Sequence, residues 1–326
     1  MARPLRIQYP GAVYHVTNRG NERMPIFKND VDRSQFLKIL TQSISTYDIR
    51  MHSYVLMSNH YHLLAETPLG NLGEFMRHFN ITYTSYFNRT HKRSGHLFQG
   101  RYKSFLVEKD AYLSAVSRYI HLNPVKIGGI RMQPPKEQLH YLWSYEWSSL
   151  PGYLSAKFSN DFMEYKFVLD EFGGDNEKGR LAYMKQLKAD LLGGVPIKEK
   201  IVGQSLLGND DFVSTIKNKY INSKTDRERP AVGVVHRYVA TENILKVLSD
   251  FLGETIDKLL TKSGVNRQIA MDVLYRLGGL KNPEIGKMMG VDYSTVSQGR
   301  KRIQAKADKD KSLRAFIKSI EKRCQE

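Results

Sequence analysis

Two histidines separated by one residue, His60 and His62, are the sharpest chemical signal in the sequence. On a β-strand, residues i and i+2 project from the same face, so both imidazoles can reach one metal ion while Tyr61 points the other way. Taken alone, the pair fits two ordinary surface or edge histidines better than a metal site. It indicates a metal only in combination with further groups.

Tyr119 and Asn123 form a second group, four residues apart in the segment SRYIHLNPVK. Residues at this spacing share a face of an α-helix. A tyrosine there can act as a nucleophile, and an asparagine oxygen can complete a metal site. Taken alone, the same two residues fit a packed tyrosine and an asparagine that ends the helix before Pro124.

Together the two groups predict a site that cleaves phosphodiesters. A metal ion held by His60, His62 and Asn123 would make a bound phosphodiester more electrophilic and neutralise its developing charge. Because tyrosine ionises only near pH ~10, a neighbouring cation would help the Tyr119 phenolate to form. Its attack on phosphorus would give a covalent phosphotyrosine. Two imidazoles, one amide and an oxygen-rich substrate favour Mg²⁺ or Mn²⁺, with Zn²⁺ as an alternative.

The elements that must position these groups alternate between short strands and amphipathic helices. The patterns predict strands over 12–19, 52–59, 60–67 and 102–108, and helices over 30–47, 72–90 and 110–123, the last capped by Asp110. This order predicts a ferredoxin-like α+β domain with an antiparallel sheet. Its last helix can lie across the strand face that carries His60 and His62. Aromatic residues at helical spacing in 75–87 are expected in the core rather than stacked on bases, namely Phe75, Phe79, Tyr83 and Phe87.

Charge and composition favour a nucleic-acid partner. The 326 residues include 50 Lys and Arg against 33 Asp and Glu, a net charge of +17. The net charge is +9 over residues 1–155, +2 over 156–240 and +6 over 241–326, so both ends are basic. The single cysteine, Cys324, excludes an internal disulfide and a Cys-rich zinc site. No apolar run of about 18 residues and no secretion signal are present, so we expect a cytoplasmic protein.

Four separated stretches resemble, in the right order, motifs of HUH-type single-tyrosine transposases, in particular the REP-associated tyrosine transposases of bacteria. The stretches are YHVTNRGNER (14–23), YVLMSNHYHLL (54–64), GHLFQGRYKS (95–104) and YIHLNPVK (119–126). The resemblance covers about residues 1–150. It implies a metal-dependent transposase or nickase, associated with the bacterial nucleoid, that cuts and rejoins single-stranded DNA next to REP-like hairpins. By this resemblance Tyr119 is the nucleophile that forms a 5′-phosphotyrosine and frees a 3′-OH, and His60, His62 and Asn123 are the metal ligands.

Basic and polar residues around this site are the predicted DNA contacts of the first 155 residues. They lie in the N-terminal arm, after the first strand, beside the fourth strand and next to Tyr119. They are Arg3, Arg6, Arg19, Asn21, Arg23, Arg101, Lys103 and Arg118. A solvated tail, an ordinary turn around Gly20, and an Arg118 that points away from Tyr119 are the competing interpretations.

Residues 265–303 predict a helix, a turn and a second helix capped by Asp292 or Ser294, a pattern typical of helix-turn-helix DNA readers. The segments Arg267-Gln268-Ile269-Ala270-Met271 and Asp292-Tyr293-Ser294-Thr295 resemble the C-terminal DNA-binding domain of the initiator DnaA, with tyrosine in place of a histidine. The predicted contacts are Arg267, Tyr293, Ser294, Thr295, Gln298, Arg300 and Lys301. A helical bundle with a charged surface is the alternative.

The chain is therefore expected to comprise a catalytic domain over 1–155, a mainly helical middle or linker region over 156–240, and an all-α helix-turn-helix domain over 241–326. Two functions fit this organisation. The first is an enzyme acting on single-stranded DNA and hairpins, with the C-terminal domain on duplex DNA. The second is a non-catalytic DNA-binding regulator derived from a transposase. A monomer and a homodimer are both compatible with the sequence.

Overall fold

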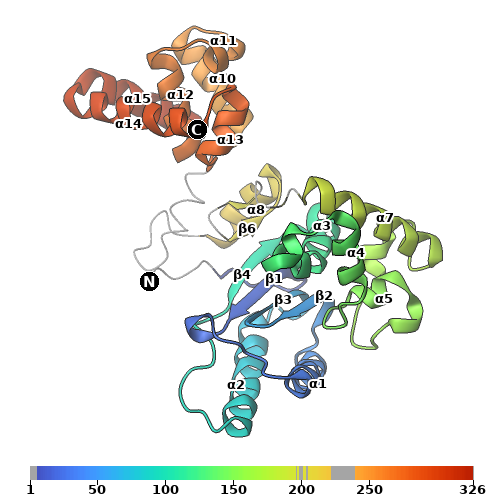
Figure 1. Ribbon diagram of the computed structural model, residues 1–326. Coiled ribbons are helices and arrows are strands. Elements are labelled where there is room, and N and C mark those ends of the chain that lie inside the picture. Colours follow the sequence, from blue (N-terminus) through green and yellow to red (C-terminus); the bar gives the residue numbers. More distant parts are fainter. Residues whose placement is uncertain (1–5, 196, 198–200, 203–204, 222–238, 326) are drawn as a thin grey trace. The chain divides into compact units, whose positions relative to one another are not determined.

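The computed structural model describes residues 6–195, 197, 201–202, 205–221 and 239–325 (Figure 1). The chain divides into two compact units, one of residues 6–200 and 205–208 and the other mainly of residues 209–326. Each unit is considered by itself, and the expected three-part division at 155 and 240 stays a prediction. In the described part of the chain, no helix combines the length and apolar character that a membrane crossing requires.

A sheet forms the centre of the first unit. Its four long strands are β1 (Ala12–Arg19), β2 (Arg50–Met57), β3 (His60–Thr67) and β4 (Lys103–Val107). They lie in the order β2-β3-β1-β4 with every neighbouring pair antiparallel, which is the predicted ferredoxin-like arrangement. A short strand missed by the sequence patterns, β6 (Leu206–Leu207), adds parallel to β4. The sheet is therefore mixed rather than purely antiparallel.

Helices cover both faces of this sheet. The helices α1 (Asp30–Tyr47) and α2 (Leu72–Thr90) lie on one face, and α3 (Lys109–His121) lies on the other (Figure 1). Tyr61 points toward α1 and α2, because its ring contacts Phe36 and Phe79 and its hydroxyl donates to Asn80. The aromatic residues predicted for the core on α2 are all fully buried. Tyr61 and the aromatic residues of α2 thus pack on the α1–α2 face of the sheet, whereas His60 and His62 project from the face that α3 covers.

The boundaries of α3 differ from those expected. Glu108, not Asp110, occupies the N-cap position, and Asp110 lies in the first turn. The helix ends at His121, and a 3₁₀ turn, η2 (Asn123–Lys126), follows. Pro124 has no amide hydrogen to continue the α-helical ladder, which accounts for the early end. Asn123 therefore lies just beyond the helix that carries Tyr119.

Later segments of the first unit close the outer edge of β2. The amide of Leu56 donates to Trp147 at 2.8 Å, and the amide of Glu164 donates to Met51 at 2.7 Å. Such cover prevents an exposed strand edge from pairing with another chain. The remaining short elements are η1 (Asn21–Arg23), η3 (Gly128–Met132), α4 (Pro135–Trp143), α5 (Leu150–Leu154), η4 (Ala156–Phe158), α6 (Lys166–Asp170) and α7 (Glu177–Gly193).

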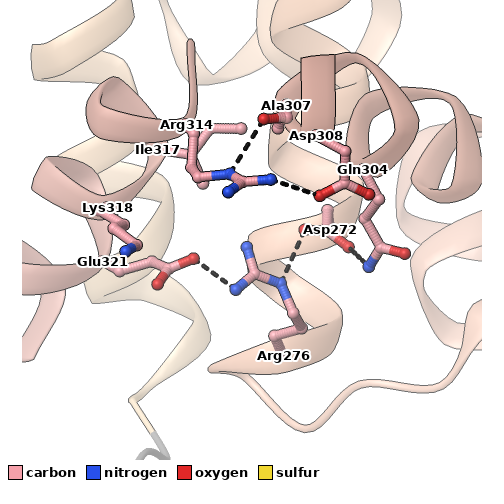
Figure 2. Close-up of a pocket in the computed structure, with 9 residues that line it drawn as sticks. All are labelled: Asp272, Arg276, Gln304, Ala307, Asp308, Arg314, Ile317, Lys318 and Glu321. Carbon is pink, nitrogen blue, oxygen red and sulfur yellow. Dashed lines mark hydrogen bonds and ion pairs between the residues drawn. The ribbon is translucent and has the colours of Figure 1, made fainter. Parts of the chain in front are cut away.

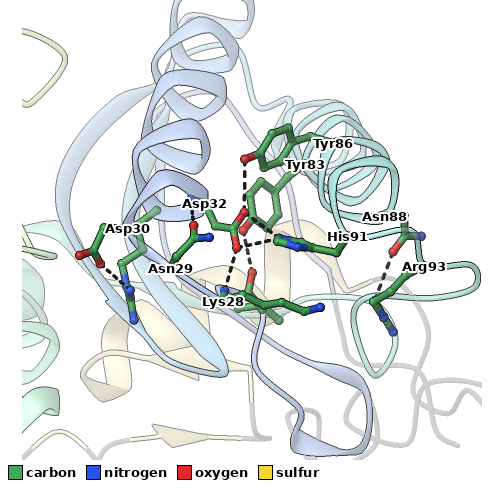
Figure 3. A network of polar contacts seen from close by, with 11 residues as sticks. Lys28, Asn29, Asp30, Asp32, Tyr83, Tyr86, Asn88, His91 and Arg93 are labelled. Atoms are coloured by element: carbon green, nitrogen blue, oxygen red, sulfur yellow. Dashed lines mark hydrogen bonds and ion pairs between the residues drawn. The ribbon is translucent and has the colours of Figure 1, made fainter.

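Asp32 ties the start of α1 to the end of α2 (Figure 3). Its buried carboxylate accepts hydrogen bonds from the amide of Lys28 at 2.7 Å, the Tyr86 hydroxyl at 3.2 Å and the His91 ring at 2.9 Å. Asn29 caps α1 by accepting from the Asp32 amide. A buried carboxylate needs several such donors. The network holds α1 and α2 together as one layer on the face of the sheet opposite α3.

The second unit is described mainly by helices. They are α8 (Asp210–Tyr220), α10 (Thr241–Leu252), α11 (Ile256–Thr261), α12 (Val265–Arg276), α13 (Asn282–Met289), α14 (Tyr293–Lys309) and α15 (Lys311–Gln325), with the short β5 (Ile201–Val202). Gly290, at a φ of 64°, ends α13, and the Asp292 side chain caps α14 by accepting from the Ser294 amide. The expected helix, turn and helix are thus observed. Asp292 rather than Ser294 is the cap.

A pocket between α12, α14 and α15 is crossed by ion pairs (Figure 2). Arg276 bridges Asp272 and Glu321. Asp272, only 2% exposed, also accepts from Gln304 at 2.8 Å. Because a buried carboxylate is costly unless paired, these contacts fix α14 against α12. The charges of Asp272, Arg276 and Glu321 in this pocket are used in contacts that pack the helices.

Candidate active site

His60 and His62 project from the same face of β3, as their spacing predicts. Their ring centroids are 5.1 Å apart, and Tyr61 between them is buried on the opposite face. The Nδ1 atom of His60 lies 2.8 Å from the side-chain oxygen of Asn59. An amide oxygen only accepts, so Nδ1 carries the hydrogen and Nε2 keeps its lone pair. His60 is thereby held in a form that can ligate a metal.

A third histidine, His15 on β1, completes this cluster. In the antiparallel register Thr17 lies opposite His62, so His15, two residues earlier on β1, shares the same face. Its Nε2 atom is 2.9 Å from Nδ1 of His62. The alternating pattern of residues 12–19 could have placed His15 on this face. The pairing with β3 that brings it to His62 is not visible in one sequence.

Tyr119 lies over the histidine cluster from α3. Its ring meets His15 edge-on at 5.9 Å and His62 at 6.4 Å between centroids. The Nζ atom of Lys126 sits 3.9 Å from the centroid of the Tyr119 ring. Burial raises the pKa of the Tyr119 phenol. A nearby positive charge, here that of Lys126, favours ionisation of such a phenol. The sequence patterns did not predict a role for Lys126.

Asn123 is placed beside Tyr119 by the turn that follows α3. Its side-chain nitrogen donates to the carbonyl oxygens of Tyr119 at 2.9 Å and Ile120 at 3.2 Å. Both of these bonds use the amide hydrogens, which leaves the side-chain oxygen as the group that can accept or ligate. The amide is therefore oriented, although Asn123 is not on the helix as expected.

All three histidines of the cluster are electrically neutral near pH 7. Burial, and then the charge of Lys126, lowers the pKa of His15 to about 4. Burial, and then the charge of Arg19, lowers the pKa of His60 to about 4. Burial first, then the neighbouring imidazoles and cations, lowers the pKa of His62 well below its ordinary value. Neutral imidazole is the form that binds metal.

The donor set fits a divalent cation in part. Two neutral imidazoles and an amide oxygen are chemically suitable for Mg²⁺ or Mn²⁺ when substrate oxygens complete the shell. Within the described residues, no group of three or more His, Cys, Asp or Glu side chains is arranged to hold a metal ion. A metal at this site would thus depend on Asn123 and on the substrate, and the metal stays a prediction.

The predicted DNA contacts of the first unit fall into two classes. Arg19, Arg23, Arg101 and Lys103 are exposed and Asn21 is half-buried, with Arg19 opposite His60 in the β1–β3 register. Arg6 instead donates to the carbonyl of Tyr102 and stacks over its ring. Arg118 pairs with Asp190 at 2.6 Å and is only 12% exposed, which favours a structural role. Arg3 lies outside the described residues.

Gly20 lies in the turn that follows β1, next to Arg19 and Asn21. Its φ of −58° is open to any residue, and Gly20 itself is buried. A Cβ atom there would lie 2.1 Å from the carbonyl oxygen of Met24. Glycine at this position therefore allows the turn to pack closely against the Met24 carbonyl.

In the second unit, the predicted contacts at the start of α14 are open to solvent. Tyr293 is 61% exposed, and Ser294, Thr295, Gln298 and Lys301 are exposed as well. Arg300 stacks over the ring of Tyr275 and donates to Asn282 at 2.9 Å. Arg267 donates to the carbonyl of Met289. Arg267 and Arg300 thus stabilise the packing of the helices. The exposed residues of α14 are the predicted contacts that DNA can reach.

Comparison with known proteins places the site within a family segment. Residues 8–123 match the model of the family described as "Transposase IS200 like". No curated protein matches the chain. A solved structure described as "Structure of the REP associates tyrosine transposase bound to a REP hairpin" is similar over 54% of this chain and 98% of the other, with 15% identity and a TM-score of 0.39. The segment 8–123, which contains the histidines of the cluster together with Tyr119 and Asn123, is therefore similar to the IS200-like transposases.

Proposed function

We propose that this protein cleaves and rejoins single-stranded DNA next to REP-like hairpins, through a covalent 5′-phosphotyrosine at Tyr119. The observation that carries the proposal is the position of Tyr119, in contact with His15 and His62 and beneath the ammonium of Lys126. This grouping lies within the segment that matches the transposase family. A DNA substrate is also consistent with the net charge of +17, and we propose that the protein associates with the bacterial nucleoid.

In the proposed reaction the Tyr119 oxygen attacks the scissile phosphorus. The new O–P bond replaces the bond to the 3′-oxygen, which leaves with a proton as a free 3′-OH. Reversal by a 3′-OH rejoins a strand without an external energy source. A bound Mg²⁺ or Mn²⁺, held by His60, His62 and Asn123, would polarise the phosphate. Lys126 supplies positive charge beside the nucleophile as the phenol loses its proton.

The contacts also support attack within one chain. Tyr119, His15 and His62 meet inside a single protomer. The outer edge of β2 is closed by the backbone around Trp147 and Glu164, which removes one surface on which a second copy could extend the sheet. We therefore propose that the tyrosine acts on DNA held by its own histidines.

The test is a covalent adduct. Full-length protein incubated with a 5′- or 3′-labelled hairpin oligonucleotide and Mn²⁺ is expected to give a species that survives denaturing electrophoresis and carries only the label downstream of the cut. Binding of the hairpin without any adduct, across Mg²⁺ and Mn²⁺, would instead support a non-catalytic DNA-binding regulator.

For the second unit we propose contact with duplex or hairpin-stem DNA through the N-terminal half of α14. Charge reversal at the exposed Lys301, Lys301→Glu, is expected to weaken hairpin binding about tenfold or more and to flatten its salt dependence. Lys309→Glu is the matched control, since it makes the same charge change at the far end of the same helix. Fluorescence anisotropy at several salt concentrations measures both effects. Equal losses for the two variants would contradict a localised contact.

A further inference from the structure

His15 is the one member of the histidine cluster to which the proposed chemistry gives no task. It is 7% exposed, and its ring centroid lies 5.8 Å from that of Phe105 and 5.9 Å from that of Tyr119. Its Nε2 atom is directed at Nδ1 of His62, 2.9 Å away. A buried histidine aimed at a ring nitrogen of another histidine needs an explanation beyond packing.

We propose that His15 is a positioning residue that fixes the tautomer and orientation of His62, so that Nε2 of His62 is presented to a divalent cation. The proposal rests on the metal site of the proposed function and deepens it. A ligand histidine commonly donates its other ring N–H to an acceptor, which locks the ring and raises the basicity of the ligating nitrogen. His15 is that acceptor for His62.

The hydrogen bond between two neutral rings has only two arrangements. If Nδ1–H of His62 donates to Nε2 of His15, then Nε2 of His62 has a free lone pair for a metal. If Nε2–H of His15 donates instead, His62 carries its hydrogen on Nε2 and cannot ligate through that atom. A cation at His62 therefore selects the first arrangement, with the His15 hydrogen on Nδ1. His60 is held in the same tautomer by Asn59.

His15 is better suited to positioning than to direct ligation. Its Nε2 atom is already engaged with Nδ1 of His62 at 2.9 Å. His15, His60 and His62 also do not form a three-residue group arranged to hold a metal, within the part of the chain that the structure describes. In this proposal the cluster therefore consists of two metal ligands, His60 and His62, and one residue, His15, that orients His62.

The test is Mn²⁺ binding to the full-length protein without DNA, measured from the electron paramagnetic resonance signal of free Mn²⁺. His15→Phe keeps a ring against Phe105 and Tyr119 but removes the acceptor, and is expected to weaken Mn²⁺ binding about 10–100-fold. His15→Gln restores an acceptor oxygen and is expected to recover most of the affinity. Nitrogen-15 chemical shifts of the His62 ring report its tautomer directly.

The outcomes separate this proposal from the proposed function. Wild-type affinity in His15→Phe, or a folded His15→Gln that binds no better than His15→Phe, overturns the positioning role whether or not the protein cleaves DNA. Failure of the wild type to form a DNA adduct, with intact Mn²⁺ binding and the expected order of variants, overturns the cleavage proposal alone. If His15→Phe does not fold, two measurements still test the positioning role. They are the Mn²⁺ affinity of His15→Gln compared with that of the wild type, and the nitrogen-15 chemical shifts of the His62 ring.

Discussion

Tyr119→Phe is expected to abolish the covalent protein–DNA adduct, with a decrease on the order of 10³-fold or more in the rate of strand cleavage. The substitution removes only the nucleophilic oxygen. The ring can still contact His15 and His62 and lie beneath Lys126, so folding and hairpin binding should persist. Single-turnover cleavage of a labelled hairpin oligonucleotide measures the rate, and anisotropy measures binding.

The matched control is Tyr112→Phe, which removes a phenol oxygen from the same helix seven residues earlier. We expect that variant to cleave at nearly the wild-type rate. An adduct that persists in Tyr119→Phe would exclude Tyr119 as the nucleophile.

His60→Ala is expected to reduce cleavage by at least about 10²-fold while leaving hairpin affinity within about threefold of wild type. His60 lies at the first residue of β3 and is only half-buried, so its removal should not unfold the sheet. The loss arises because one imidazole ligand is gone from the predicted metal site. Cleavage rates at increasing Mn²⁺ concentration, with anisotropy and circular dichroism on the same samples, separate these effects.

His96→Ala serves as the control, since His96 is an exposed histidine of the same unit. Unchanged cleavage in His60→Ala would contradict the ligand role. Loss of folding in His60→Ala would indicate that His60 has a structural role at the start of β3.

Local patterns in the sequence predicted most of the first unit. The bounds of β1, α1, β3 and α2 agree with the expected ranges, because each is set by hydrophobic periodicity within the segment itself. β2 begins at Arg50, two residues earlier than expected. β6 was not foreseen because its parallel pairing with β4 depends on residues about a hundred positions apart. Tertiary pairing, not local propensity, creates such short strands.

In the candidate site, too, local patterns predicted some features, whereas others depend on tertiary contacts. The spacing of His60 and His62 predicted their shared face, since a strand alternates with period two. The contribution of His15 required the β1–β3 register, and that of Lys126 required the turn that follows α3. The pairing of Arg118 with Asp190, 72 residues later in the chain, likewise could not be read from the basic character of Arg118.

Peptide mapping of the covalent adduct tests the central claim most directly. After nuclease and trypsin digestion, cleavage after Arg118 and Lys126 yields the peptide YIHLNPVK, whose single tyrosine is Tyr119. Tandem mass spectrometry is predicted to find this peptide carrying a nucleotide joined through its 5′-phosphate to the Tyr119 oxygen. A nucleotide on any other residue, or a YIHLNPVK peptide that stays unmodified while the adduct forms, would contradict the account.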